Sequence, residues 1–393
     1  MLGEEEARAK ILDRVKLHSR CKIPVETARG CFVAQDVFAR LPLPVFDNSA
    51  MDGYALIARD SKRGSQLRVV GEQPAGVDRR LHVRGGEAVR IFTGAPIPSG
   101  ADAVVMQEDV TRDSDEIVVN AEVEPGEFIR RRGCDLSEGQ RILAAGERLR
   151  AENLALLAAQ GFTEIEVGGV VRAAILSTGD ELVSPGKPIE PGQLYESNSV
   201  LLRALVEGTG AEVELVRSVP DRADDLKAAL SDGLKRDVLV VSGGVSVGDR
   251  DLVRPLLKEL GAEIDLWRVA IKPGKPFLFG RRGNCAIFAL PGNPVSAFVT
   301  FLVFVRPAIL KMMGAGEDAL SLPKTVARLK DDMSNDGDRA HYFRGALRDG
   351  EFRSVGRQES HALYGLSRSN ALLRLAPGEK ISAGSSVSVY LWN

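Results

Sequence analysis

The chain has 393 residues, which is too long for one ordinary hydrophobic core and suggests two to four domains at about 150 residues each. Its 52 lysines and arginines nearly balance 54 aspartates and glutamates, so the charge gives no sign of a nucleic-acid or membrane partner and favours a small one. The four cysteines form no CxxC pair, which disfavours zinc, iron–sulfur and disulfide frameworks, and no export signal is evident; we therefore expect a cytoplasmic protein.

The first third of the chain combines helical and β patterns. Residues 4–17 carry apolar side chains at helical spacing and predict an amphipathic helix. A second helix is expected over 151–160 and should end at Gly161, a natural left-handed cap position. Between them, 41–146 is dense in glycine, proline and short Val/Ile runs, which predicts a β-domain inserted between the two helices.

From about residue 170, strands alternate with helical patterns. The expected strands are 171–176, 213–219, 238–241, 266–271 and 286–290. Their near-continuous Val/Ile/Leu runs predict a three-layer α/β domain, with a mostly parallel sheet covered by helices on both faces. The strand-to-helix loops then meet at the carboxyl edge of the sheet, where ligands bind.

Two further apolar stretches complete this prediction. Residues 284–305 carry no charge and are long enough to span a bilayer, but PGNP at 291–294 breaks the stretch, which indicates a buried strand and a core helix. The last 70 or so residues contain short alternating strands and predict a small all-β domain.

The loop 242–251, SGGVSVGDRD, is neither a Walker A loop nor GxGxxG, but its glycines can expose backbone N–H groups to phosphate. Several carboxylates at the same sheet edge would repel a polyanion unless a hard cation lies between them. These carboxylates are Asp180, Glu181, Asp221, Asp249 and Asp251. A magnesium-bridged nucleotide or pyrophosphate meets this condition; alternatively, Asp249 and Asp251 only cap the next helix.

Two more loops are candidates for an anion site. KPGKP sets Lys272 and Lys275 on one rigid turn, which suits a small oxyanion, although a solvated hairpin turn is the simpler interpretation. LPGNPVS supplies Asn293 and Ser296 at the start of a helix, and local rules alone would explain it as a well-formed helix N-terminus. No histidine lies beside the five sheet-edge loops, which argues against Ser-His-Asp or Cys-His chemistry.

The outer domains hold further polar motifs. In PVFDNSAMDGYA, Asp47 and Asp52 are candidates, with a capped turn as the alternative. Thr93 follows a strand in RIFTGAP, and FIRRRG holds Arg131 in a basic triplet that is either an anion clamp or a solvated charge run.

Together, FDNSAMDGYA, RIFTGAP, FIRRRG, STGDEL, SGGVSVGDRD, AIKPGKP and LPGNPVS resemble the molybdopterin molybdotransferase family, the bacterial MoeA proteins and the E domain of gephyrin. The resemblance implies a four-part subunit that forms a homodimer. It comprises an N-terminal helical and extended part, an inserted β-domain, the α/β molybdopterin-binding domain and a C-terminal β-barrel. Their respective boundaries are 1–41 with 140–169, 42–139, 170–316 and 317–393.

The same resemblance implies insertion of molybdate into adenylylated molybdopterin, with Mg²⁺, cleavage of the phosphoanhydride and release of molybdenum cofactor and AMP. The catalytic residues it implies are Asp52, Asp221, Asp251, Lys272 and Lys275, and the metal ligands are Glu181, Asp221 and Asp251. The implied substrate contacts are Thr93, Arg131, Ser177, Thr178, Gly179, Ser242, Gly243, Gly244, Ser246, Asn293, Ser296, Arg344 and Ser360. Asp52 and Thr93 are expected to act across the dimer.

Two other functions stay open. A molybdopterin adenylyltransferase shares the α/β domain but carries a GGTG signature, whereas Val245 and Ser246 follow the glycines here. A binding scaffold of the gephyrin E-domain type is the second, and the adenylyltransferase itself is a possible protein partner. Molybdate and tungstate are nearly equal in size and charge, so the sequence does not distinguish them.

Overall fold

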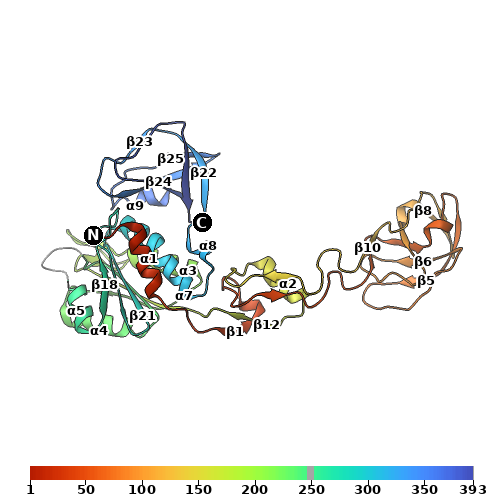
Figure 1. Ribbon diagram of the computed structural model, residues 1–393, viewed down its shortest axis with the longest axis horizontal. Helices are drawn as coiled ribbons and strands as arrows, with labels where there is room; N and C mark the ends of the chain where they lie inside the picture. Colours follow the sequence, from red (N-terminus) through yellow and green to blue (C-terminus); the bar gives the residue numbers. More distant parts are fainter. Residues whose placement is uncertain (246–251, 393) are drawn as a thin grey trace. The chain divides into compact units, whose positions relative to one another are not determined.

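The computed structural model describes residues 1–245 and 252–392 (Figure 1). The chain divides into two compact units, one built from Met1–Gln35, Ala144–Ala158 and Phe162–Asn393, the other from Asp36–Leu143 and Ala159–Gly161. Three residues singled out from the sequence, Ser246, Asp249 and Asp251, lie outside the described residues. The four-part boundaries given above stay a prediction.

A six-stranded sheet forms the centre of the first unit. In spatial order its strands are β16 (Glu212–Val219), β13 (Arg172–Thr178), β17 (Val238–Ser242), β21 (Cys285–Leu290), β20 (Leu278–Arg282) and β18 (Glu263–Trp267). The first four are parallel, while β20 runs antiparallel to both of its neighbours. The predicted mostly parallel sheet is thus confirmed, with an antiparallel strand pair at one end.

Helices cover both faces of this sheet, and its central strands bury side chains on both sides. Ala173 and Ile175 of β13 pack into one core and Ala174 and Leu176 into the other, as the alternation along a strand requires. On the first face lie α1 (Glu4–Arg14), α3 (Asn198–Thr209), α6 (Pro294–Thr300), the π-helical turn η4 (Phe301–Val305) and α7 (Arg306–Met312). On the second lie α4 (Ala223–Gly233) and α5 (Val253–Glu259).

The charge-free segment 284–305 contains the predicted buried strand and the start of the predicted core helix. Residues 294–312 form one helical run that is long and apolar enough to cross a membrane. Within its most apolar 18-residue stretch, however, 89% is buried inside the fold. This run lies between the sheet and α1, so its composition reflects a core position.

The C-terminal strands close into the predicted barrel. These strands are β22 (Lys324–Leu329), β24 (Ala340–Arg348), β25 (Glu351–Ser354), β26 (Ala371–Leu375) and β28 (Ser386–Leu391). Pairing of β24 with β26 completes the ring, which removes the open sheet edges. Short elements flank it: α8 (Glu317–Leu320), β23 (Met333–Ser334), α9 (Leu363–Ser367) and β27 (Lys380–Ile381).

One predicted strand was wrong. Residues 266–271 are divided between two sheets: β18 ends at Trp267, and β19 (Ile271–Lys272) pairs in parallel with β24 of the barrel. Arg268 between them has a left-handed φ of 70°, which turns the chain away from the first sheet. The KPGKP loop therefore follows a strand of the barrel sheet, and the expectation that all the candidate loops leave one sheet fails for this loop.

The N-terminal extended part of this unit pairs β1 (Cys21–Pro24) with β12 (Glu164–Val167), next to α2 (Ala151–Ala159). Gly161 has the predicted left-handed conformation, with φ of 73°. The short strands β14 (Leu182–Val183) and β15 (Leu194–Tyr195) pair beside the carboxyl edge of the large sheet.

The second unit contains its own six-stranded sheet and confirms the inserted β-domain. In spatial order the strands are β7 (Ala103–Met106), β4 (Gly53–Leu56), β6 (Glu87–Ile91), β5 (Gln66–Gln73), β9 (Glu116–Val119) and β8 (Val110–Asp113). Two strand pairs complete it, β3 (Asn48–Ser49) with β10 (Ile129–Arg130) and β2 (Val37–Phe38) with β11 (Arg141–Leu143).

Candidate functional site

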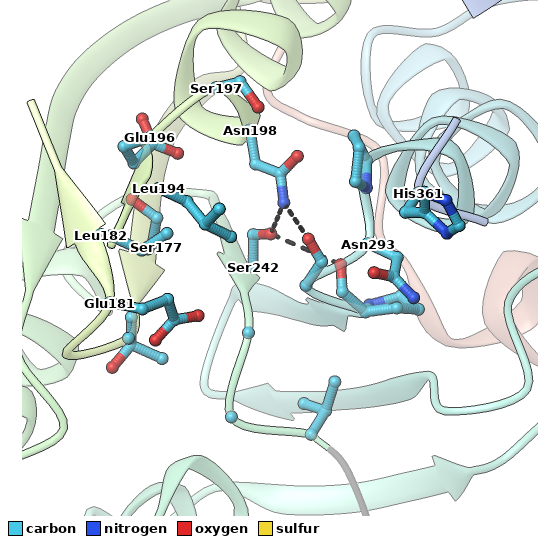
Figure 2. A pocket seen from close by; sticks show the side chains of 18 of the residues that line it. Ser177, Glu181, Leu182, Leu194, Glu196, Ser197, Asn198, Ser242, Asn293 and His361 are labelled. Carbon is cyan, nitrogen blue, oxygen red and sulfur yellow. Dashed lines mark hydrogen bonds between the residues drawn. The ribbon is translucent and has the colours of Figure 1, made fainter. Parts of the chain in front are cut away.

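A cavity of about 750 Å³ lies at the carboxyl edge of the large sheet, as predicted from the strand order. It is lined by the ends of β13, β17 and β21, by the start of α3, and by His361 and Leu363 from the segment before and at the start of α9 (Figure 2). Seven predicted substrate contacts line it: Ser177, Thr178, Gly179, Ser242, Gly243, Gly244 and Asn293. The sequence therefore located the cavity correctly.

One end of the cavity is acidic. Glu181 and Asp221 both line it. The Thr178 hydroxyl donates a hydrogen bond to Asp221 Oδ1 over 2.5 Å, and the Asp221 backbone N–H donates to Asp180 Oδ1 over 3.0 Å. These bonds fix the loop that follows β16 against the loop that follows β13.

Two carboxylates on one cavity wall suit magnesium, which binds through one or two carboxylates while water and substrate phosphates supply its other ligands. Within 1–245 and 252–392 no group of three or more His, Cys, Asp or Glu side chains could enclose a metal alone. The donor set of Glu181 and Asp221 thus fits a cation that arrives with a phosphorylated substrate, and does not fit a structural zinc site.

The glycine loop after β17 packs tightly enough to require both glycines. A Cβ on Gly243 would lie 2.4 Å from the carbonyl oxygen of Thr178, and one on Gly244 would lie 2.5 Å from a methyl group of Val253. Both residues also have left-handed φ angles, 94° and 63°. The loop therefore brings bare backbone to the cavity wall next to Thr178.

The predicted oxyanion residues separate into two groups. Lys272 and Lys275 are exposed, and neither lines the cavity, although Pro276 beside them does. Asn293 Nδ2 donates to Ser360 Oγ over 2.8 Å, and the Ser360 carbonyl accepts the backbone N–H of Val295 over 3.1 Å. Ser360 thus contacts the first turn of α6.

Two other predicted oxyanion residues are buried. Ser296 is only 4% exposed, inside the first turn of α6. Arg344 is 1% exposed and donates to the carbonyls of Glu359, over 3.2 Å, and Arg357. The hydrogen bonds described for the Arg344 guanidinium therefore hold the 357–359 segment, which leads into Ser360.

His341 adds an unexpected feature beside the lysine loop, because it pairs with Lys272 across β24 and β19. It is 5% exposed and its Nε2 is buried with no hydrogen-bond partner among the described residues. Burial, and then the charges of Lys272, Arg344 and Arg339, lower the pKa of His341 to about 4. These charges make the region electropositive.

The second unit holds a separate pair of predicted site residues, Asp52 and Thr93. The backbone N–H and the hydroxyl of Thr93 both donate to Asp52 Oδ1 over 2.8 Å, and these bonds lower the pKa of the exposed Asp52 carboxyl. Asp52 and Thr93 are therefore brought together, as their shared role would require. Arg131 instead forms an ion pair with Asp47 over 2.8 Å, between two side chains that are partly exposed to solvent.

Comparison with known proteins decides the family. Models of the "MoeA N-terminal region (domain I and II)", the "Probable molybdopterin binding domain" and the "MoeA C-terminal region (domain IV)" match residues 3–161, 174–311 and 326–392. The molybdopterin molybdenumtransferase of Haemophilus influenzae is 36% identical, over 100% of this chain and 99% of its own length. The chain belongs to the MoeA family.

Other members of the MoeA family agree with this assignment. The molybdopterin molybdenumtransferase of a Nostoc species is 39% identical over 92% of this chain and 86% of its own length. A crystal structure of the molybdopterin biosynthesis moeA protein from Pyrococcus horikoshii OT3 superposes with a TM-score of 0.83 at 31% identity, covering 100% of both chains. The multidomain fold predicted from the sequence is thus confirmed as the MoeA fold.

Within this MoeA-type cavity, Asn198 and Glu196 are polar residues that the sequence reasoning missed. Both are buried and line the cavity. Glu196 accepts the backbone N–H of Ser199 over 2.8 Å, and Asn198 donates to Ser242 and to Gly292. Their only sequence signal is the polar run ESNS before an apolar helix, which by itself indicates a helix start.

Proposed function

We propose that this chain is a molybdopterin molybdotransferase. It inserts molybdate into adenylylated molybdopterin, adds water across the phosphoanhydride, and releases molybdenum cofactor and AMP. The observation that carries the proposal is the similarity over the whole chain to relatives named molybdopterin molybdenumtransferase. The acidic, glycine-lined cavity supports it, because such a cavity suits a metal-bound phosphoanhydride.

The adenylate end of the site is assigned to the loops after β13, β16 and β17. Gly243 and Gly244 leave backbone uncovered, so phosphate oxygens can approach it closely. Thr178 holds Asp221 by its Oδ1, and we assign Asp221 Oδ2 and the Glu181 carboxylate to the magnesium ion. When bound, the ion neutralises charge that develops on the phosphates.

The oxyanion end is assigned to the KPGKP loop and its surroundings. Lys272 and Lys275 attract the molybdate dianion by charge, and Asn293 with Ser360 offers hydrogen-bonding groups nearby. Arg344 acts through the backbone of the 357–359 segment, which keeps Ser360 against α6. No nucleophilic side chain is needed, since positioning and charge neutralisation carry this chemistry.

We further propose that the active form is a homodimer in the cytoplasm, with Asp52 and Thr93 supplied by the second copy, and that the adenylyltransferase hands over the substrate. The resemblance of FDNSAMDGYA and RIFTGAP to family motifs supports the dimer. The lowered pKa of Asp52 supports its role, because the exposed carboxylate stays ionised at neutral pH.

The proposal is tested by supplying the purified protein with adenylylated molybdopterin, Mg²⁺ and molybdate. We expect AMP release and a cofactor that activates a molybdenum-free apoenzyme. AMP that forms only from ATP and unmodified molybdopterin would identify an adenylyltransferase instead, and no AMP in either reaction would favour a binding scaffold. A parallel series with tungstate measures the preference between the two oxyanions.

A further inference from the structure

Asn198 connects three elements of the cavity wall. It is the first residue of α3, is 8% exposed, and lines the cavity between the ends of β17 and β21 (Figure 2). Its Nδ2 donates to Ser242 Oγ over 2.8 Å and to the Gly292 carbonyl over 2.6 Å. One side chain thus links the glycine loop after β17 with the LPGNP loop after β21.

The orientation of this amide is defined by chemistry. A carbonyl oxygen can only accept, so the atom of Asn198 that faces Gly292 must be the nitrogen. Both Nδ2 hydrogens are then in use, while Oδ1 is buried and has no partner among the described residues. A buried acceptor without a partner destabilises the fold, so packing alone does not explain an asparagine here.

Helix capping does not explain it either. The N-cap position of α3 is Ser197, and neither hydrogen bond of the Asn198 amide goes to the backbone of α3. Instead, the buried Glu196 carboxylate accepts a hydrogen bond from the Ser199 backbone N–H in the first turn of α3. The amide of Asn198 therefore serves the neighbouring loops and not its own helix.

The direction of these bonds constrains Ser242. Because the Ser242 hydroxyl oxygen accepts from Asn198, its hydrogen must point to another acceptor. The protein acceptor described for it is the Pro291 carbonyl at 3.5 Å, at the limit of a hydrogen bond. We propose that Asn198 is a positioning residue that makes Ser242 a hydrogen-bond donor to a phosphate oxygen of the bound adenylate, and that it fixes the spacing of the two loops.

The choice of adenylate rests on the proposed function, so AMP with Mg²⁺ is the probe. We compare binding by calorimetry for the wild type, Asn198→Ala, Ser242→Ala and the double variant. Asn198→Ala should weaken AMP binding about 10-fold, because Ser242 loses its orientation. In the Ser242→Ala background the same change should cost about 3-fold or less, since contacting residues are coupled. Fully additive losses would contradict the proposal.

Asn198→Asp adds a test of hydrogen-bond direction. An ionised carboxylate accepts the Ser242 hydrogen and repels the Gly292 carbonyl, so AMP binding at pH 8 should weaken about 10- to 100-fold. Burial raises the pKa of such a carboxyl, and its protonated form donates again. Relative to wild type at each pH, binding should therefore recover towards about pH 5.5. A purely structural defect would not recover.

Asn153→Asp is the matched control, because Asn153 uses its oxygen to accept the Arg150 backbone N–H and an aspartate can do the same. It should bind AMP as the wild type does. If Asn198→Asp does not fold, the comparison of Asn198→Ala with Ser242→Ala and the double variant decides alone. A wild type that does not bind AMP overturns the proposed function, whereas a wild type that binds AMP no better than the Asn198 variants overturns only the positioning role.

Discussion

Asn293 and Ser360 meet over 2.8 Å although 67 residues separate them, and they join the first turn of α6 to the segment before α9. The Ser360 carbonyl also accepts the Val295 backbone N–H. Ser360→Ala keeps this backbone bond and removes only the hydroxyl. We expect stability to change by about 1 kcal/mol or less, and the molybdate concentration for half-maximal AMP release to rise up to about 10-fold.

The control for this change is Ser367→Ala, whose hydroxyl donates to the Tyr364 carbonyl within α9. It removes a comparable hydrogen bond in the same region and should leave the molybdate requirement unchanged. Equal molybdate curves for Ser360→Ala and the wild type would remove the Ser360 hydroxyl from the oxyanion site.

Replacing Lys275 tests whether the positive charge of the KPGKP loop attracts molybdate. Because Lys275 is exposed on the KPGKP loop and does not line the adenylate cavity, Lys275→Ala should raise the molybdate requirement about 10-fold while AMP binding persists. The effect should diminish at high salt, where exposed charges are screened. Lys380→Ala, another exposed lysine, is the control. A molybdate dependence that Lys275→Ala leaves unaltered would exclude this lysine.

The sequence predicted those features that depend on local pattern. Alternation of apolar strands and helices predicted the α/β sheet and the edge at which Thr178, Asp221 and Ser242 meet. The sequence could not assign Ile271 and Lys272 to the barrel sheet, because their pairing with β24, about 70 residues later, produces no local sequence pattern. The burial of Arg344 could not be predicted either, because its hydrogen-bond partners are backbone carbonyls, which every residue has.

Gly243 offers a test of the glycine loop with a close control. Gly243 and Gly192 have the same left-handed φ of 94°, but a Cβ at Gly192 meets nothing within 4 Å, whereas at Gly243 it would lie 2.4 Å from the Thr178 carbonyl. Gly192→Ala should cost only the backbone strain, about 1 kcal/mol. Gly243→Ala should additionally displace the loop and reduce AMP release at least about 100-fold. Near-normal turnover of Gly243→Ala would show that the loop does not hold the nucleotide.

His341 makes the stability of the fold depend on pH. Its folded pKa of about 4 lies below the unfolded value, so between the two the unfolded chain binds more protons. The free energy of unfolding should therefore fall as the pH drops from about 6.5 to about 4, by about 2–3 kcal/mol at most. Denaturant titrations of the wild type and His341→Gln measure this difference. If His341→Gln keeps the full pH dependence of the wild type, that dependence comes from other titratable groups.

The proposed dimer is tested by mixing two inactive variants. Asp52→Asn removes the carboxylate that Thr93 orients in the second unit, and Gly243→Ala displaces the glycine loop of the first unit. If each site takes its two parts from different copies, a mixed dimer contains one site with both parts intact. Random exchange of subunits then gives about half mixed dimers and restores about one quarter of wild-type AMP release at saturating adenylylated molybdopterin. Mixtures that stay as inactive as the separate variants would place all the catalytic groups within one copy.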